Sequence, residues 1–167
     1  MRASLPAPHT GPFDAPGLED LRRAGDTLVR RARQEIALLS LDLDAALYDR
    51  VEFIQALKTF ALASPRRRIR ILVKDPKPAL LSGHRLPYLA ERLSSRIFIR
   101  RLPELDAEIQ ACLLLADRHG YLRRPSCRLR DGVADFHAPL EVARHWDEFE
   151  ERWQRSVEDP ALRRLHL

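Results

Sequence analysis

The sequence predicts an α/β fold, in which a mixed sheet is covered by helices on both faces. Short apolar runs of strand length alternate with segments whose apolar residues recur at helical spacing. The first run, residues 36–44, begins apolar on both faces, as in strands that are buried between helices. The predicted order is helix, strand, helix, strand, helix, strand, hairpin and helix, which is typical of a mixed sheet between two layers of helices.

The chain is predicted to form one domain after a flexible lead-in. Residues 1–16 contain four prolines among small residues and are expected to be extended or flexible. Residues 17–167 are long enough for one domain with a sizeable core. The first helix is expected to begin at Leu18, where leucines and alanines recur along one side and most arginines lie off it.

Two further helices and the last helix have sequence signals at their starts. Asp49, followed three residues later by Glu52, is a capping box. Pro87 is tolerated only in a first turn, so the next helix starts near Gly83 or His84, and Pro139 starts the last one. The predicted core side of the helix after Asp49 consists of Phe53, Ile54, Leu57, Phe60 and Ala61. That of the last helix consists of Leu140, Ala143, Trp146, Phe149, Trp153 and Val157.

The remaining strands are predicted over residues 69–73 and 96–102 and in a hairpin. The hairpin joins the apolar run 111–116 to Tyr121 and Leu122 through a turn of three to five residues. Gly120 is expected to take a positive φ in that turn. Residues 125–135 are expected to be irregular.

Composition describes a basic globular chain. Its 167 residues are 45% hydrophobic and 32% charged, with a net charge of +5. Lysine occurs only three times, so nearly all 29 basic residues are arginine. Arginine suits planar, bidentate partners such as carboxylate and phosphate, although GC-rich coding explains the bias equally well. No apolar run is long enough to span a membrane and no apolar leader is present, so we expect no membrane insertion.

The two cysteines, Cys112 and Cys127, form no zinc-binding pattern. Cys112 lies in an apolar run and is expected to be a small core residue. A reduced, cytoplasmic protein fits this pattern. No metal site and no cofactor is predicted.

Candidate ligand-binding residues follow the parallel strands, whose carboxyl ends are the usual place for clefts. Residues expected there are Asp42, Asp44, Asp75, His84 and Arg85, with Asp117 or His119 reaching it through the hairpin. The turn Ser82–Arg85 would offer free backbone N–H groups, a helix dipole and a guanidinium to an anion. The alternative is a capping turn in which His84 bonds to a neighbouring loop. The candidate anion ligands are Gly83, His84, Arg85, Asp117, His119 and Arg123.

Two other patterns have a functional and a structural interpretation. Asp117 and His119 would form an acid–base pair, or Asp117 would cap backbone N–H groups of its own turn. Arginine groups at residues 66–68, 100–101, 123–124 and 163–164 would contact a phosphate backbone if they shared one face. Otherwise they form a solvated surface. The aromatic content of 7% argues against a platform that stacks single-stranded bases.

Residues 38–44, 53–57 and 69–75 together resemble the opening of a phospholipase D-like domain. In that superfamily a later strand carries His-x-Lys followed four residues on by Asp, where His attacks a phosphodiester and Lys holds the phosphate. Aligning that Asp with Asp117 places Gln110 at the His and Cys112 at the Lys. An amide is no nucleophile and a buried thiol is no cation. The resemblance covers residues 36–156 and implies a degenerate active site.

The whole chain is similar to a group of uncharacterised bacterial proteins with this degenerate domain. The stretches that carry the likeness are residues 83–86, 93–97, 115–117, 132–139 and 162–167. Some of these proteins are labelled acetyltransferase-related. This chain lacks the acetyl-CoA loop of that domain, Arg/Gln-x-x-Gly-x-Gly/Ala, and its six glycines never fall two apart, so we reject that label.

The resemblance implies a non-catalytic module that binds a phosphorylated ligand or a protein partner. Single-copy phospholipase D-like domains resemble half of a two-lobed enzyme and pair about a twofold axis, so a homodimer is expected. Two alternatives remain: a basic nucleic-acid-binding module, and a phosphodiesterase or other hydrolase with a relocated site that uses His84, Asp117 and His119.

Overall fold

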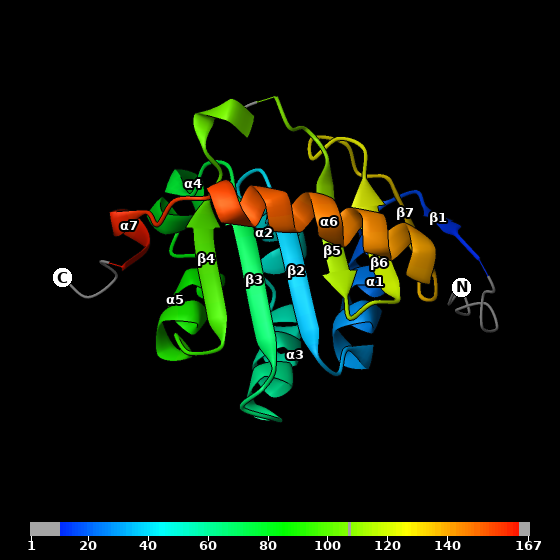
Figure 1. Cartoon of the computed structure of the whole chain (residues 1–167), viewed down its shortest axis with the longest axis horizontal. Helices are drawn as coiled ribbons and strands as arrows, with labels where there is room; N and C mark the ends of the chain where they lie inside the picture. The colour runs from blue at the N-terminus through cyan, green and yellow to red at the C-terminus, as the bar shows by residue number, and fades with distance from the viewer. Residues whose placement is uncertain (1–10, 107, 164–167) are drawn as a thin grey trace.

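The computed structural model describes residues 11–106 and 108–163 and confirms the predicted α/β sandwich with a mixed sheet. Seven strands lie in the order β1-β7-β6-β5-β2-β3-β4 (Figure 1). The strands are β1 (Phe13–Ala15), β2 (Glu35–Ser40), β3 (Arg68–Val73), β4 (Ile97–Arg101), β5 (Cys112–Ala116), β6 (Gly120–Arg124) and β7 (Gly132–Asp135). The α-helices are α1 (Leu18–Arg31), α2 (Ala45–Tyr48), α3 (Val51–Leu62), α4 (Lys77–Leu81), α5 (Arg85–Arg92), α6 (Pro139–Arg155) and α7 (Pro160–Arg163). A 3₁₀ helix, η1, covers Glu104–Asp106.

Strand direction divides the sheet into two halves. β2, β3 and β4 are parallel, because helices α3 and α5 lie in the connections between them. β5 pairs antiparallel with β2, and β6, β7 and β1 continue the antiparallel half. The chain therefore enters β5 at the carboxyl ends of the parallel strands and leaves it at their amino ends.

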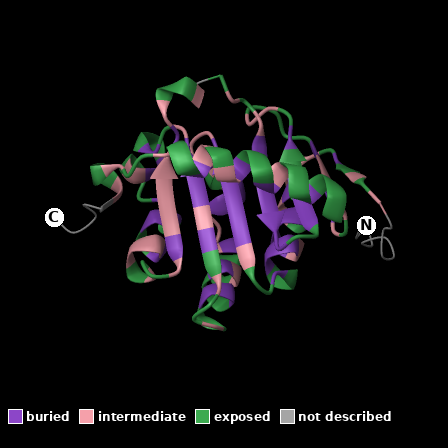
Figure 2. Ribbon diagram, in the orientation of Figure 1, coloured by how far each residue is buried: buried purple, intermediate pink, exposed green. Residues whose placement is uncertain are grey.

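Each face of the sheet has its own core, as the apolar start of the first predicted strand requires. Ile36 and Leu38 of β2 pack into the larger cluster with α1, α3 and α5, whereas Ala37 and Leu39 pack into the cluster with α6. In Figure 1, α6 crosses one face alone while α1, α3 and α5 lie behind the sheet. The central strands are buried and the outward side of α6 is exposed (Figure 2).

The apolar side of α6 differs from the prediction. Val142, Trp146, Phe149 and Trp153 are buried, at the spacing of one helix stripe. Leu140 and Val157 are exposed. Ala143 is exposed too, because it lies one position beyond the buried Val142. The Arg70 guanidinium lies 5.4–5.6 Å from the centroids of the three aromatic rings on this side and pairs with Glu150.

Two short strands, the edge strand β1 and its neighbour β7, lie where the sequence predicted none. Within the expected lead-in, residues 13–15 form β1, which pairs with β7 in the stretch that was expected to be irregular. Residues 1–10 and 164–167 lie outside the described residues. Short strands of this kind have little pattern of their own and depend on a neighbour for their backbone hydrogen bonds.

The hairpin turn has the predicted length but another conformation. Residues 117–119 connect β5 to β6, and the positive φ, 51°, belongs to Asp117 and not to Gly120. Asp is one of the residues that tolerates this region. Gly120 is required for a different reason, since a Cβ there would lie 2.6 Å from Cδ2 of the buried Leu28. Close packing of α1 on the sheet therefore depends on this glycine.

We predict that Gly132→Ala lowers the free energy of unfolding by about 1–3 kcal/mol, because its Cβ would lie 2.7 Å from the Arg123 backbone carbonyl oxygen. Gly25→Ala in α1 is the control: its Cβ would meet side chains only at 3.6 Å and beyond. Alanine there should raise the free energy by up to about 1 kcal/mol. Urea denaturation measures both, and equal effects of the two changes would contradict the register of β6 and β7.

Candidate functional site

The carboxyl ends of the parallel strands gather polar residues around the loop that follows β2. Backbone N–H groups of Lys74 and Asp75, after β3, donate to the carbonyl oxygens of Ser40 and Leu41. Asp42, Asp44, Asp75, His84 and Arg85 all lie at this edge, as predicted. It is the upper edge of the sheet in Figure 1.

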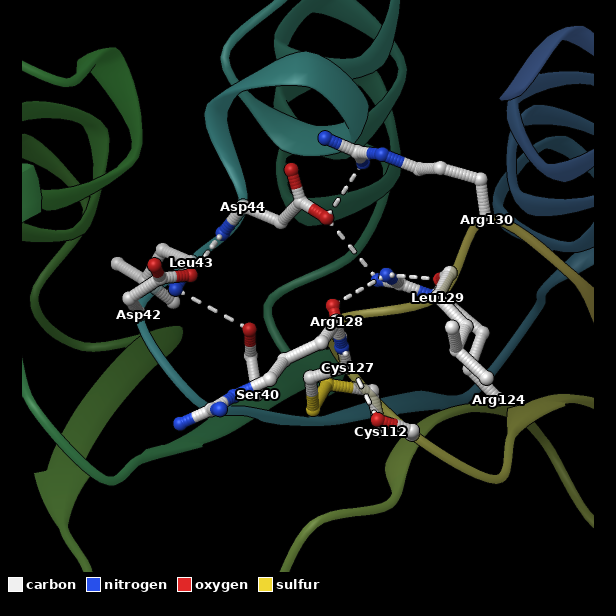
Figure 3. The surroundings of a disulfide bond; sticks show 11 residues. Ser40, Asp42, Leu43, Asp44, Cys112, Arg124, Cys127, Arg128, Leu129 and Arg130 are labelled. Atoms are coloured by element: carbon white, nitrogen blue, oxygen red, sulfur yellow. Dashed lines mark hydrogen bonds and ion pairs between the residues drawn. A yellow bond between two sulfur atoms is a disulfide. The ribbon is translucent and has the colours of Figure 1, made fainter.

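The loop after β2 turns sharply at a buried leucine. Leu43 has a φ of 64°, and its backbone N–H donates to Ser40 Oγ at 3.1 Å. A left-handed leucine costs of order 1–3 kcal/mol, so the surrounding contacts must hold it in place. Asp44 follows directly and projects its carboxylate over the edge of the sheet (Figure 3).

His84 is one of the groups that hold this loop. Its side chain is buried; Nδ1 accepts from the Leu86 N–H at 3.1 Å, and Nε2 lies 2.9 Å from the Leu43 carbonyl oxygen. These contacts assign the proton to Nε2 and leave the ring with no nitrogen for a ligand. His84 is therefore the cap of α5 bonded to a neighbouring loop, the alternative considered for the Ser82–Arg85 turn. Gly83 precedes it with a φ of 70°.

Arg85 is occupied by Asp49. Its backbone N–H and its Nη1 both lie 3.1 Å from Asp49 Oδ1. The predicted capping box is consequently wrong: α3 begins at Val51, its N-cap is Arg50 with no side-chain cap, and Asp49 serves the start of α5 instead. The capping-box pattern assigned the Asp49 carboxylate to the start of α3, but this carboxylate instead contacts Arg85 of α5.

Arg124 is the central buried charge of this edge (Figure 3). Nη1 lies 3.1 Å from Asp44 Oδ2, Nη2 lies 2.6 Å from the Cys127 carbonyl oxygen, and Nη2 and Nε also reach the Leu129 carbonyl oxygen. The side chain is 1% exposed. Arg130, whose side chain is 47% exposed, donates to the same Asp44 oxygen at 2.7 Å. One carboxylate oxygen thus accepts from two guanidinium groups, and the three side chains together keep one positive charge.

Burial raises the pKa of nearby Tyr48 to about 12; the Asp44 carboxylate adds to the rise and Arg124 opposes it. The Tyr48 hydroxyl therefore stays protonated at neutral pH.

The two cysteines are joined in a disulfide, which overturns the expectation of reduced thiols. Cys112 lies at the start of β5 and Cys127 lies in the loop between β6 and β7, and their Cα atoms are 5.3 Å apart. The Cys127 N–H donates to the Gln110 carbonyl oxygen at 2.8 Å. The bond fixes the loop whose carbonyl groups accept from Arg124. Disulfides persist mainly in oxidising compartments, so it weighs against the expected reducing environment.

Asp117 lies at the opposite, amino end of the sheet. Its carboxylate accepts from the backbone N–H groups of Arg33, Gln34 and Glu35 at 2.7–3.0 Å, just before and at the start of β2. This is the capping role predicted as the alternative to an acid–base pair, although the capped groups belong to another segment. His119 stacks on His137 with ring centroids 5.9 Å apart, and the exposed Arg123 lies on β6.

The candidate anion ligands therefore do not form one site. Gly83, His84 and Arg85 lie beyond the end of β2, and Asp117 and His119 lie before its start, because β5 runs antiparallel to β2. The four arginine groups do not share a face either. Arg100 lies over Trp153, Arg101 pairs with Asp159, and residues 66–68 lie at the other end of the sheet. Residues 163–164 fall at or beyond the limit of the described side chains.

The chemistry available at the carboxyl-end site is limited. Its imidazole and its buried guanidinium already use their donors and acceptors within the protein. The described residues include no group of three or more His, Cys, Asp or Glu side chains placed to hold a metal ion. The exposed cations Arg128, in the loop between the disulfide and Arg130, and Lys77, at the start of α4, also lie near this edge.

A family model described as "Domain of unknown function (DUF7931)" matches residues 17–165. The chain belongs to this family. No curated protein sequence matches it.

Solved structures of phospholipase D-family proteins share the fold of this family member. Nuc from Salmonella typhimurium is 13% identical with a TM-score of 0.62, over 89% of this chain and 99% of Nuc. NucT from Helicobacter pylori is 11% identical with a TM-score of 0.65, over 89% and 98%. TrmBL2, an archaeal chromatin protein with "a novel mode of DNA binding", is 14% identical with a TM-score of 0.65. This chain spans 57% of TrmBL2. At these identities the likeness shows a phospholipase D-like fold and nothing finer.

Sequence reasoning missed the Arg124–Asp44 pair and the disulfide. Asp44 and Arg124 are 80 residues apart, and nothing local marks them as partners. Two cysteines outside a known pattern give no signal of pairing until the fold brings them together. Helix α4, in a stretch for which the sequence predicted no helix, was also missed; the Asp75 carboxylate accepts from its Lys77 N–H.

We predict that Arg124→Ala destabilises the protein far more than Arg130→Ala, although both side chains bond to Asp44. Removing the buried guanidinium leaves the Cys127 and Leu129 carbonyl groups without a donor, so we expect a loss of about 3 kcal/mol or more. The half-exposed Arg130 should contribute below about 1 kcal/mol. Urea denaturation of the two variants measures the difference, and equal losses would contradict the central role of Arg124.

Proposed function

We propose that this chain is a non-catalytic phospholipase D-like module that acts by binding a partner. The observation that carries the proposal is the state of Gln110 and Cys112. When the chain is aligned with the phospholipase D-like motif, Gln110 takes the position of the histidine nucleophile and Cys112 that of the lysine that holds the phosphate. Here one is an amide, and the other is a sulfur in a disulfide, which offers neither a nucleophilic thiolate nor a cation.

The other groups at this edge do not supply the missing chemistry. Arg124 would be the nearest replacement for the lysine, but its donors are directed at Asp44 and at two backbone carbonyl oxygens. His84 would be the nearest imidazole, but both ring nitrogens are bonded to backbone groups. The alternative hydrolase with a relocated site lacks support, because His84 and His119 lie at opposite ends of β2.

A protein partner has more support at this edge than a small phosphorylated ligand. A phosphate at the Ser82–Arg85 turn would compete with Asp49 for Arg85. By contrast, three leucines on the segments that follow the strands are exposed: Leu81 at 88%, Leu105 at 88% and Leu129 at 56%. They lie on α4, on η1 and in the loop after β6, along the upper edge in Figure 1. Exposed apolar side chains around a polar centre are typical of an interface.

We propose that this partner is a second copy of the chain. A twofold contact uses the same surface on both subunits, so one exposed apolar edge is sufficient for it. No helix in the described part of the chain is long and apolar enough to cross a membrane. A cytoplasmic location remains a prediction, and the disulfide is the observation against it.

The purified protein should not hydrolyse bis-p-nitrophenyl phosphate above the buffer rate, with or without added divalent metal, because no free nucleophile faces a free cation at the carboxyl-end site. Release of p-nitrophenol, followed by absorbance, measures this. Turnover that disappears in His84→Ala but persists in the exposed control His119→Ala would replace the non-catalytic proposal with a hydrolase that uses His84 at the carboxyl-end site alone. Circular dichroism of each variant establishes that it is folded.

Light scattering after size exclusion should give about twice the 19.3 kDa mass of one chain. The combined change Leu81→Glu, Leu105→Glu and Leu129→Glu should shift the mass to that of a monomer, because it places charges at the proposed contact. Leu140→Glu, on the exposed side of α6, is the control and should remain dimeric. A wild-type mass of 19.3 kDa at every concentration tested would overturn the homodimer.

A further inference from the structure

Exposed arginines gather at the amino ends of the parallel strands, opposite the carboxyl-end site. We call this set the amino-end arginine surface; it consists of Arg30, Arg31, Arg33, Arg66, Arg68 and Arg118. They come from the end of α1, the α3–β3 loop and the β5–β6 turn, along the lower edge of the sheet in Figure 1. The partly buried Arg67 and Arg96 border it.

Hydrogen bonds join these segments into one continuous surface. The Asp117 carboxylate holds the backbone of residues 33–35, and the Arg68 N–H donates to the Gln34 carbonyl oxygen at 3.3 Å. On the far side of β3, the Ile69 N–H donates to the Arg96 carbonyl oxygen at 2.8 Å. Four segments distant in sequence are thus fixed side by side by the sheet itself. Their arginines share one edge, which the sequence alone could not establish.

The charges of this surface are largely uncompensated. Within the described residues, Arg31, Arg33, Arg66 and Arg68 have no carboxylate within ion-pair distance. Arg33 and Arg68 donate to backbone carbonyl oxygens, and Arg31 lies over the Phe136 ring. Only Arg118, with Glu35 at 3.1 Å, and Arg30, 4.0 Å from Asp26, have acidic partners.

Most arginines elsewhere are paired. Those with a carboxylate within 4.0 Å are Arg22, Arg50, Arg70, Arg85, Arg101, Arg124, Arg130, Arg152 and Arg155. The concentration of unpaired guanidinium groups at one edge therefore creates a local positive field that the net charge of +5 understates.

We propose that the amino-end arginine surface binds the phosphate backbone of duplex nucleic acid, without reading its sequence. From β5 to β3 the surface spans two strand spacings, roughly 10 Å at about 4.8 Å each, and the bordering Arg96 before β4 extends it by a third. A duplex presents a phosphate on each strand about every 3.4 Å of axis, so several phosphates fall within that length. Forked guanidinium groups match phosphate oxygens, and carbonyl contacts position some of them without neutralising them.

The surroundings favour a duplex over the other polyanions. A single strand would need exposed aromatic rings to stack its bases, but Phe60 is buried and Phe136 lies beneath Arg31. A membrane would favour apolar side chains that insert between lipids. Of the large exposed apolar residues in the described chain, Leu62 at the end of α3 is the one that borders this edge. This proposal uses none of the groups at the carboxyl-end site and stands or falls independently of the proposed function.

Fluorescence anisotropy of a labelled DNA duplex of arbitrary sequence, at about 50 and about 200 mM salt, tests the proposal. We expect binding that weakens steeply with salt. The combined change Arg31→Ala, Arg66→Ala and Arg68→Ala should weaken binding at low salt at least about tenfold. It should also reduce the slope of log affinity against log salt by about 2 to 3, because each lost phosphate contact removes about 0.9. Lysine at the same three positions should retain the wild-type slope.

The matched control removes three exposed arginines elsewhere, with Arg123→Ala, Arg128→Ala and Arg144→Ala, and so makes the same change in net charge. Unchanged binding of this control, together with the loss above, supports the proposal. Three results overturn it: no binding by the wild-type protein at low salt, an equal loss in both triple variants, or binding to vesicles rich in phosphatidylserine but not to the duplex. Circular dichroism and urea denaturation of each variant, compared with the wild-type protein, establish that it is folded.

Discussion

β5 runs antiparallel to β2 in the middle of the sheet, and the Asp117 carboxylate at its end accepts three backbone N–H groups from the start of β2. This junction determines where the charged groups lie. The start of β5, with Gln110 and the disulfide, is carried to the carboxyl ends of the parallel strands. The turn that follows β5 lies at the amino ends of the parallel strands. Each end of the sheet consequently has its own set of arginines, separated by the length of the buried strands.

At the carboxyl ends of the parallel strands, several charged side chains are already used in ion pairs within the protein. Asp44 pairs with both Arg124 and Arg130, Asp49 binds Arg85, and His84 holds the left-handed Leu43. The attraction within a buried ion pair offsets the free-energy cost of desolvating its charges only when its remaining donors and acceptors are also satisfied, as those of Arg124 are. Such an arrangement resists the entry of a ligand at Arg85 or Arg124, because an anion there would have to displace a carboxylate that is already in place. The edge is therefore better suited to contact through its exposed leucines than to chemistry.

The sequence predicted the parts of the fold that depend on local periodicity. The bounds of α1, β3, β4 and the β5–β6 hairpin follow from apolar spacing and turn residues, and Pro139 starts α6 as expected. Apart from the apolar side of α6 and the missed helix α4, the errors involve contacts between distant segments. Asp49 had a correct local capping pattern but bonds to Arg85, and Gly120 is needed for the approach of Leu28 and not for its φ. β1 exists because it pairs with β7, which itself pairs with β6. Cys112 is buried as predicted, but it was expected to be a reduced thiol because no local signal links it to Cys127.

The positions of the arginines likewise could not be predicted from local sequence patterns, because they depend on contacts between distant segments. Residues 66–68 were recognised as a basic group, but the groups expected to join them lie at the other end of the sheet or in ion pairs. Their actual neighbours, Arg31, Arg33 and Arg118, come from a helix end and a turn that no charge pattern connects. A dimer formed through the carboxyl-end leucines would leave its two amino-end arginine surfaces facing away from the contact. Such a dimer presents phosphate-binding edges on opposite sides, so each subunit could engage a separate duplex segment, and neither edge would be covered by the other subunit.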